Sequence, residues 1–372
     1  MEKIKDSKAS QKYHGMKKWL FFVGLFLDLC FLLVLFFSGL TFDIKGIAVG
    51  VNPSFFAVNG IYFILISFLM YAIHFPLNYF EGFYWEHKFE LSNQDFGQWM
   101  IDSLKKNAVG LVIGLIIIEA IYTFLKIFPN TWWVWATCFW LFISFVLAKL
   151  VPNFLIPMFF KYAPIEDEEL KGKINDLFEA CKVPVKDIST IDLSTKTKKA
   201  NAFLCGVGKK KRVVLSDTLV EQFSNEEICS VVAHELGHHK HNDILKLLFV
   251  NTFATAIGFY LVKNFLNFTI HKYGLSSIDD IALFPLIILA LMVFGFVITP
   301  MMNLYSRRIE KAADRFCLDQ TKDAPSFISL MKKLGDMNLA EFDPDFFTEM
   351  FFHDHPTLKK RIEFAEKYKH EK

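Results

Sequence analysis

The sequence predicts a mainly α-helical, polytopic membrane protein with about six transmembrane helices and an α+β unit outside the apolar region. Hydrophobic residues make up 53% of the 372 residues, with 43 Phe, which is above the usual share for a soluble domain. Six apolar stretches approach the roughly 20 residues that a helix needs to cross about 30 Å of hydrocarbon. Two long polar segments, about 157–245 and 303–372, follow the fourth and sixth stretches.

The apolar stretches are the first elements that the sequence defines. They cover residues 19–39, 55–79, 107–127, 132–151, 246–266 and 281–302. The first follows a lysine-containing N-terminus, as the apolar part of a signal peptide does. It has spanning length, however, and no A-x-A-like cleavage site follows it, so we expect an uncleaved first span.

The placement of basic residues predicts the orientation. Lys and Arg gather before the first span and after the second, fourth and sixth, whereas the connections after spans one, three and five contain few. Basic residues favour the cytoplasmic side, so both termini and both polar segments are expected there. The chain then divides into 1–156 with about four spans, 157–245, 246–302 with two further spans, and 303–372.

Composition also excludes some functions. Lys and Arg number 41 and Asp and Glu number 39, so no basic field of the kind that binds nucleic acid is indicated. The six cysteines form no C-x-x-C pair, and neither a disulfide framework nor a four-cysteine zinc site is expected. They lie at positions 30, 138, 181, 205, 229 and 317.

The polar segment 157–245 predicts a small α+β unit. Helical spacing covers Glu166 to Lys182, where Val183-Pro184 ends it. Ser224 or Asn225 is the expected N-cap of a second helix, which runs from Glu226 to about His241. The expected strands are 188–193, 202–207 and 212–215, with a turn at 206–209.

The second helix carries an H-E-x-x-H motif, from His234 to His238. Four residues advance a helix by slightly more than one turn, so the two imidazoles project from one face and can share a zinc ion at about 2.0–2.1 Å. Glu235 lies too far round to be a ligand, but it is within reach of a water on the metal and can act as a general base. The motif arises by chance on the order of once in a hundred chains of this size. A plain surface helix has no structural need for these residues in this register.

A catalytic zinc ion needs a third protein ligand and an open fourth position. His239 lies about 100° round the helix from His238, and His241 lies where the chain turns, so roles facing solvent or the membrane boundary are expected for both. Glu310 and Asp314 are one turn apart after the last span. One of them can bind the metal while the other orients a ligand histidine. The alternative is an ordinary charged helix at the exit from the membrane.

Several separate motifs recur in one order along the chain. They are Glu86–Phe89 (E-H-K-F), Ser194–Phe203 ending in K-A-N-A-F, Arg212–Leu219, the H-E-x-x-H helix, the Glu310–Asp314 helix, and His355-Pro356 with Arg361. In this order and spacing they resemble the type I CAAX prenyl proteases, which are membrane zinc metalloproteases of the gluzincin kind, from about residue 55 to the end. The resemblance implies transmembrane helices that enclose a chamber and a cytoplasmic gluzincin-like zinc protease unit.

The resemblance also implies roles for individual residues at the metal. It implies one zinc ion (Zn2+) per chain, with His234, His238 and Glu310 as ligands. Glu235 would be the base, and Asp314 would orient a ligand histidine from behind.

Further roles concern the substrate. The resemblance implies that Asn201 and Ala202 lie on an edge strand that pairs with the substrate backbone, a mode that recognises main chain more than side chain. His355 and Arg361 would stabilise the oxyanion and position the substrate. The substrate would be a peptide or protein, prenylated or embedded in the bilayer.

The eukaryotic members of that family have seven spans and a longer insertion before the zinc helix. This chain has six predicted spans and a short approach, so it resembles a bacterial member of an inner membrane. Membrane protein quality control is then an alternative to prenyl processing. The mid-span carboxylates Asp28 and Glu119 fit either a water-filled chamber or a hydrogen bond between spans.

Two other classes of function remain open. In a site-two-type intramembrane protease the H-E-x-x-H motif lies inside an apolar span, whereas here the polar stretches 225–227 and 240–243 flank it. A membrane scaffold or transporter with a vestigial metal site would tolerate the loss of Glu235, which is present.

Overall fold

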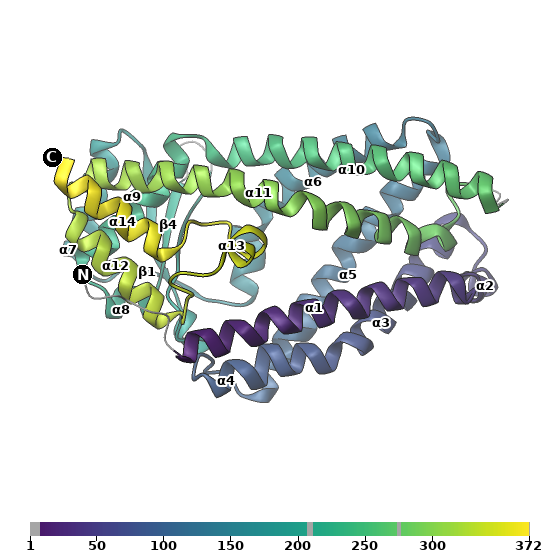
Figure 1. Cartoon of the computed structure of the whole chain (residues 1–372), viewed down its shortest axis with the longest axis horizontal. Coiled ribbons are helices and arrows are strands. Elements are labelled where there is room, and N and C mark those ends of the chain that lie inside the picture. Colours follow the sequence, from purple (N-terminus) through teal and green to yellow (C-terminus); the bar gives the residue numbers. More distant parts are fainter. Residues whose placement is uncertain (1–7, 207–210, 274–276, 372) are drawn as a thin grey trace.

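The computed structural model describes residues 8–206, 211–273 and 277–371. Six helices in these ranges are long and apolar enough to cross a membrane, which confirms the predicted number of spans. Figure 1 shows them extended along the long axis of the molecule. They lie in α1 (Lys8–Phe37), α3 (Phe55–Tyr79), α5 (Phe96–Ile127), α6 (Trp132–Leu150), α10 (Asp243–Tyr273) and α11 (Phe284–Thr321).

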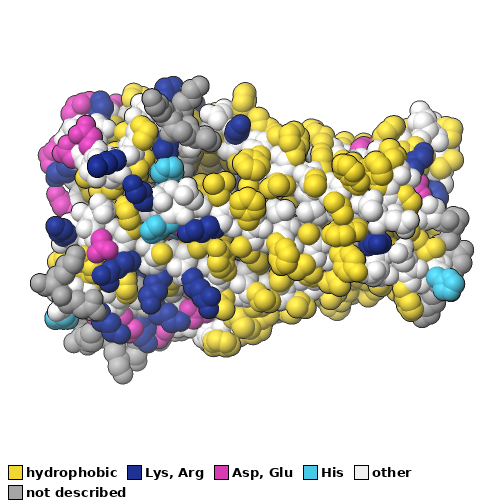
Figure 2. All heavy atoms as spheres, turned by 90° about the horizontal axis from the view of Figure 1, so that it is seen from above, with side chains coloured by type: hydrophobic (Ala, Val, Ile, Leu, Met, Phe, Trp, Pro, Cys, Tyr) yellow, Lys and Arg dark blue, Asp and Glu magenta, His cyan; other side chains and the backbone are white. Residues whose placement is uncertain are grey.

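The outer surface of these helices is apolar. Phe26 is 63% exposed, Phe68 is 68% exposed and Phe253 is 70% exposed. Figure 2 shows that such side chains form a broad band, with charged side chains gathered mainly at the end that carries the sheet. A band of this extent on a folded protein indicates contact with lipid.

Several helices extend beyond the apolar stretches that predicted them. α1 begins at Lys8 and α5 at Phe96, and α11 continues through the charged stretch around Arg307 to Thr321. Hydropathy marks only the part of a helix that lies in hydrocarbon, so it ends a span where the polar residues begin. As a consequence, the last span and the segment that carries Glu310 and Asp314 form one continuous helix.

The six spanning helices form a closed ring. Around it, α1 packs against α3, α3 against α5, α5 against α6, α6 against α10, α10 against α11, and α11 against α1. Five of the six helices have a long stretch in which no residue is buried. These stretches are 67–84, 103–117, 137–150, 244–257 and 288–308. Side chains in these stretches are all at least partly exposed, as expected if the ring encloses a chamber.

The end of the ring away from the sheet, here called the far end, is closed by a helix that the sequence did not predict and by the first residues of the sixth predicted span, which form a separate short helix. These are α2 (Leu40–Val51) and the short helix η5 (Ile281–Leu283), which pack against each other and against α3. Thr41 donates to the carbonyl of Ala282 at 2.9 Å, and its hydroxyl is 2.6 Å from that of Tyr62. Buried side chains including Tyr122 form a core there.

At the other end, here called the sheet end, the chain forms the predicted α+β unit. Its sheet has the order β1-β2-β4-β3, in which β2 and β4 are parallel and the other pairs are antiparallel. Three strands were predicted, β1 was not, and the predicted turn at 206–209 lies mostly outside the described residues. The strands are β1 (Tyr162–Pro164), β2 (Val185–Ile191), β3 (Ala202–Cys205) and β4 (Lys211–Ser216).

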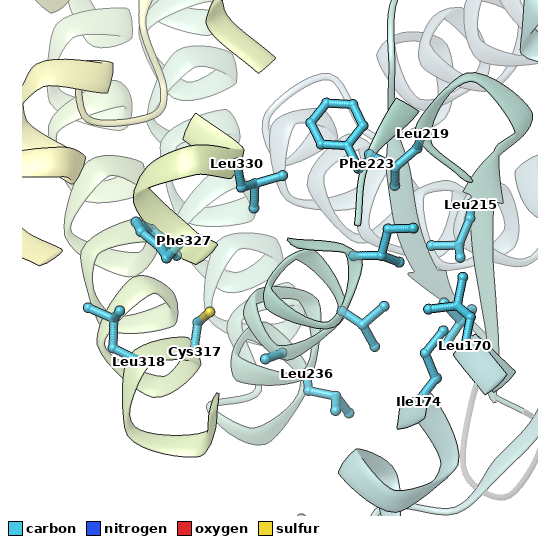
Figure 3. Close-up of a cluster of buried hydrophobic side chains, with 14 of the residues drawn as sticks. Leu170, Ile174, Leu215, Leu219, Phe223, Leu236, Cys317, Leu318, Phe327 and Leu330 are labelled. Carbon is cyan, nitrogen blue, oxygen red and sulfur yellow. The ribbon is translucent and has the colours of Figure 1, made fainter. Parts of the chain in front are cut away.

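The helices of this unit surround one hydrophobic core. Figure 3 shows Leu236 of α9 at its centre, between Leu170 and Ile174 on one side and Cys317 and Phe327 on the other. These side chains are almost fully buried, so α9 is held between the two groups. Besides α11, the helices that contribute to this core are α7 (Glu168–Ala180), α8 (Asp217–Gln222), α9 (Asn225–Lys240), α12 (Ala324–Met337) and α14 (Leu358–Glu371). A further helix, α13 (Phe346–Phe352), packs against α11.

Short helical segments lie in the connections at the sheet end. They are the π-helical η1 (Phe80–Trp85) and η2 (Val151–Leu155), α4 (Glu86–Lys88), and the 3-10 helices η3 (Ile156–Met158) and η4 (Leu193–Thr195). Two of them, η2 and η3, join α6 to β1. All six cysteines are free. Cys181 and Cys317 are buried as expected of structural thiols, whereas Cys138 is exposed on α6.

Candidate active site

The position of α9 is fixed at its N-terminus by a capping box. The Ser224 side chain accepts from the Glu227 N–H, and the Glu227 carboxylate accepts from the Ser224 N–H. The same carboxylate accepts from Ser329 at 2.6 Å and from Lys333 at 2.8 Å, both on α12. The sequence predicted this cap, and the structure adds that it ties α9 to α12.

A glycine within the H-E-x-x-H motif lets α9 lie directly on α11. A Cβ at Gly237 would be 3.1 Å from the Ala313 Cα and 3.2 Å from the Phe316 Cβ. Neither atom is at the end of a flexible side chain, so any larger residue would push the two helices apart. This close approach brings the histidines of α9 within reach of Glu310 on α11.

His234, His238 and Glu310 form the one group of three or more potential metal-ligating side chains found in the described residues. The His234 Nε2 is 3.1 Å from the His238 Nε2 and 3.1 Å from the Glu310 Oε2, and the His238 Nε2 is 3.3 Å from the Glu310 Oε1. Tetrahedral ligands at about 2.0–2.1 Å from zinc lie about 3.3 Å from one another. The spacing therefore suits a zinc ion with three protein ligands.

Both histidines are oriented by carboxylates behind them. The His234 Nδ1 is 2.9 Å from the Asp314 Oδ1, and the His238 Nδ1 is 3.1 Å from the Asp243 Oδ2. An ionised carboxylate can only accept a hydrogen bond, so each Nδ1 carries the proton and each Nε2 presents a lone pair. Two lone pairs that face each other beside a carboxylate repel unless a cation lies between them. The donor set thus fits a metal ion.

Without a metal, protons are the cations available to this group. Burial disfavours the charged form of His234, but its hydrogen bonds to Asp314 and Glu310 outweigh burial and raise the pKa of His234 to about 9. A metal binds only the unprotonated imidazole, so protons compete with it. Metal affinity should therefore fall as the pH falls.

Arg361 lies behind the metal group. Its guanidinium donates to both oxygens of Asp314, at 2.9 and 2.5 Å. One of its nitrogens is 3.4 Å from the His234 Nδ1. Such a two-pronged contact fixes the carboxylate, and Arg361 thereby acts on His234 through Asp314.

His355 approaches the metal group from the open side. Its side chain is 50% exposed, and its Nε2 is 3.2 Å from the Glu310 Oε2. The other ring nitrogen, Nδ1, is 2.7 Å from the Asp354 carboxylate. His355 can therefore donate a proton or a hydrogen bond to a group bound beside Glu310.

A cavity of about 180 Å³ opens next to the metal group. The strand β3 forms one side of it and is an edge strand, because it has β4 as its single neighbour in the sheet. The Asn201 carbonyl accepts from the Ser216 N–H of β4 at 2.9 Å. Peptide groups alternate in direction along a strand, so the N–H of Ala202 points away from β4, where the Asn201 side chain accepts it at 2.9 Å. A second chain can pair with this edge.

The structure brings all the predicted site residues together. Asn201, Ala202, His234, Glu235, His355 and Arg361 line the cavity, His238 and Glu310 complete the metal group, and Asp314 lies behind it. His239 and His241 lie outside the group, and the His241 ring packs against Phe316 at 5.7 Å between centroids. Sequence reasoning missed two contributors, Gly237 and Asp243. An acidic residue at the start of the next helix was a signal for Asp243.

Comparison with known proteins shows which family the chain belongs to. Residues 164–369, more than half of the chain, match the model described as peptidase family M48. The chain belongs to peptidase family M48. In this M48 peptidase, residues 3–161 also match the model described as "CAAX prenyl protease N-terminal, five membrane helices". Five of its longer helices fall in that range, of which α2 with 12 residues is too short to span.

Relatives of the M48 peptidase cover most of its length. It is similar to CAAX prenyl protease 1 of Saccharomyces cerevisiae, with 32% identity over 80% of this chain and 70% of that one. It is also similar to the uncharacterized metalloprotease YhfN of Bacillus subtilis, with 27% identity over 96% and 85%. The crystal structure of S. mikatae Ste24p has the same fold, with a TM-score of 0.84 at 24% identity over 96% of this chain and 88% of that one.

Together these findings confirm the predicted class of protein. The M48 peptidase is a multi-pass membrane protein and a metalloendopeptidase, which hydrolyses peptide bonds. Nothing in the fold or in the relatives favours an intramembrane site-two-type enzyme or a scaffold.

The close approach at Gly237 leads to a first testable prediction. Gly237→Ala should push α9 away from α11 by a few tenths of an ångström and weaken metal binding, because ligand distances hold within about 0.2 Å in metal sites. We expect metal content after dialysis and peptide cleavage to fall together. Gly172→Ala is the control, since Gly172 lies in α7 with no atom within 4 Å of the added Cβ, and it should stabilise the helix by about 1 kcal/mol. Equal metal content in both variants would contradict the prediction.

Proposed function

We propose that this M48 peptidase is a zinc-dependent endopeptidase, with His234, His238 and Glu310 as the zinc ligands and one zinc ion per chain. One observation carries the proposal. Two imidazoles, each held by a carboxylate at Nδ1, direct their Nε2 atoms at a third carboxylate with ligand spacing. Two histidines and one carboxylate are a common ligand set for catalytic zinc. The ion would supply a Lewis acid that polarises a peptide carbonyl and makes a nearby water more acidic.

Glu235 is the general base of this proposal. It follows His234 on α9, is partly exposed and lines the cavity beside the metal group. From there its carboxylate can take a proton from the attacking water and pass it to the leaving amine. His355, 3.2 Å from Glu310, is placed to donate a hydrogen bond to the oxyanion. We assign Arg361 to positioning, through Asp314.

The substrate would bind as an added strand along β3. Ala202 presents its peptide N–H at the free edge, beside the cavity, and main-chain pairing of this kind depends little on sequence. Across the cavity, α12 contributes an apolar wall that fits one apolar side chain of the substrate. The wall consists of Phe327, Leu330, Met331 and Leu334.

The names of the relatives and the geometry of the site point to different classes of substrate. Several relatives are named CAAX prenyl protease 1, a name that points to prenylated substrates. The backbone-pairing edge, by contrast, favours peptide segments in general. We propose that unmodified segments near the bilayer are cut and that prenylation is not required, as in quality control in a bacterial inner membrane.

One experiment tests metal and substrate together. The full chain is purified in detergent, its metals are quantified, and cleavage of a farnesylated CAAX peptide is compared with that of a matched unmodified peptide. We expect zinc near one per chain and less than about a tenfold preference in kcat/KM for the lipid, which corresponds to less than about 1.4 kcal/mol. A strict requirement for the farnesyl group would favour prenyl processing. A different metal at full occupancy would remove zinc from the proposal.

The orientation is a further prediction, supported by the gathering of Lys and Arg at the sheet end (Figure 2). We expect the sheet, the metal group and both termini in the cytoplasm. In a Cys138→Ser background, a membrane-impermeant maleimide should label Asn130→Cys, in the exposed loop after α5, on intact cells. It should label Lys198→Cys, exposed beside the sheet, only after lysis. The reverse pattern would place the active site in the opposite compartment.

A further inference from the structure

A second cavity lies where three spans leave the apolar region. Its volume is about 340 Å³, and it shares no lining residue with the active-site cavity. Gly82 lines it from η1, directly after α3, Lys106 lines it from α5, and Phe159 and Phe160 line it from the segment after α6. Lys106 directly precedes an apolar stretch that spans the bilayer. The cavity therefore lies at the level of lipid headgroups, on the sheet side of the membrane region.

One carboxylate of this cavity, Glu86, already has three protein donors. It accepts from the Tyr13 hydroxyl at 2.5 Å, from Lys17 at 2.7 Å and from Lys199 at 2.9 Å. Lys199 also donates to the Tyr13 hydroxyl at 3.1 Å. A cationic ligand would have to displace one of these donors to reach Glu86.

The second carboxylate, Asp102, is buried and is satisfied as well. It accepts from Gln94 at 2.7 Å and from the ammonium of Lys196. That ammonium also lies over the Phe160 ring, 4.8 Å from its centroid. Asp102 thus offers little to a cation.

The lysines of the cavity, in contrast, have donors to spare. Each ammonium has three N–H groups, and Lys196 and Lys199 use one and two of them in the hydrogen bonds described above. Lys106 lines the cavity, is exposed, and has no ion-pair partner within the described ranges. Three lysines face two carboxylates, so the cavity carries one net positive charge together with unused donors. Its electrostatics therefore select an anion.

We propose that this cavity binds the phosphodiester headgroup of an anionic phospholipid. Its volume is within the roughly 300–1,000 Å³ of small-molecule sites, and basic residues at the membrane surface attract anionic lipids by about 1 kcal/mol each. The aromatic side chains of Phe159 and Phe160 form an apolar part of the wall, on which the glycerol and the first methylenes can pack. An acyl chain then continues along the apolar surface of the spans.

Headgroup binding has a consequence for the active site. Lys199 lines the headgroup cavity, and the next residue, Ala200, lines the active-site cavity. Ala200 leads into Asn201 and the edge strand, and its N–H donates to the Asn338 side chain at 3.2 Å. A headgroup that engages Lys199 holds the segment from which the edge strand starts. The lipid should therefore lower the KM of a peptide more than it changes kcat.

Native mass spectrometry of the delipidated full chain in detergent tests the site without using activity. Phosphatidylglycerol and phosphatidylcholine with the same acyl chains are added in turn, and the retained lipid is counted. The variant is Lys106→Met. The matched control is Lys105→Met, because Lys105 is the neighbouring residue of α5 and is also exposed, but it donates to the Met158 carbonyl and does not line the cavity.

We expect one phosphatidylglycerol to be retained in preference to phosphatidylcholine. Lys106→Met should weaken that retention about fivefold, the equivalent of about 1 kcal/mol, and Lys105→Met should leave it unchanged. Glycerol phosphate, which lacks acyl chains, should not displace the lipid at equal concentration. Equal effects of the two variants, no headgroup preference, or displacement by glycerol phosphate would overturn the proposal. Displacement by a peptide substrate would instead assign the cavity to the substrate groove.

Discussion

Glu235→Gln is expected to abolish peptide cleavage while leaving bound metal near one per chain. The side chain lies beside the metal group and lines the cavity without belonging to the ligand set. Loss of a general base alone costs about 100- to 10,000-fold in rate, and glutamine keeps the shape while losing the basicity. The measurements are single-turnover cleavage of an unmodified peptide and metal quantification on the same preparation.

A matched control exists on the same helix. Glu226→Gln makes the same chemical change in the first turn of α9, where the Glu226 carboxylate pairs with Lys173 at 2.8 Å, away from the cavity. It should leave cleavage and metal content unchanged. If Glu235→Gln kept even a tenth of the parent rate, the role of base would have to pass to another group.

Glu310→Ala is expected to remove the metal along with activity. It leaves two imidazoles as protein ligands, and metal content after dialysis should fall to a small fraction of that of the parent. Asp314→Asn leaves the three ligands in place but removes the negative charge beside His234 and Arg361. It should reduce metal affinity or rate about 10- to 100-fold, while the variant still loads with metal in excess. Asn is preferred to Ala here because Arg361 is buried against Asp314, and truncation would leave a cavity beside that charge.

The order of these two effects tests the assignment. Metal retained by Glu310→Ala but lost in His239→Ala or His241→Ala would mean that the site is formed from α9 alone. The structure argues against that outcome, because the His241 ring is turned toward Phe316. If that outcome were nevertheless found, Glu310 of α11 would have to be removed from the ligand set.

Sequence patterns predicted those parts of the molecule whose structure is determined by residues within one segment. The six spans followed from hydropathy, and α9 followed from an N-cap at Ser224 or Asn225 and an H-E-x-x-H register, which are both local. The local spacing of Glu310 and Asp314 identified them as a pair, and the family resemblance assigned Glu310 as the ligand. The site residues that the sequence predicted therefore lie within short continuous motifs.

Other features depend on contacts between distant segments, and sequence did not reveal them. Gly237 has its role because Ala313 lies 3.1 Å away from its missing Cβ, which no pattern in α9 encodes. β1 has three residues and forms only where β2 offers it an edge. α2 contains a glycine pair and is held by Thr41 and η5. In each case tertiary packing outweighs local preference.

Because α11 is one helix, it links the metal centre directly to the far end of the ring. From Ile287, buried in the far-end core, to Glu310 the helix rises roughly 35 Å. Pro300 lies between them and cannot donate a hydrogen bond within the helix, so the helix can bend there. A bend of one degree at Pro300, roughly 15 Å from Glu310, moves the carboxylate by about 0.3 Å. Metal ligands tolerate about 0.2 Å. His234 and His238 keep their distances to Glu310, because α9 packs directly on α11 and the chain turns from α9 into α10 at Asn242. A change in bilayer thickness that moves the sheet end of α11 is therefore expected to move α9 with it, so that the three ligands stay together.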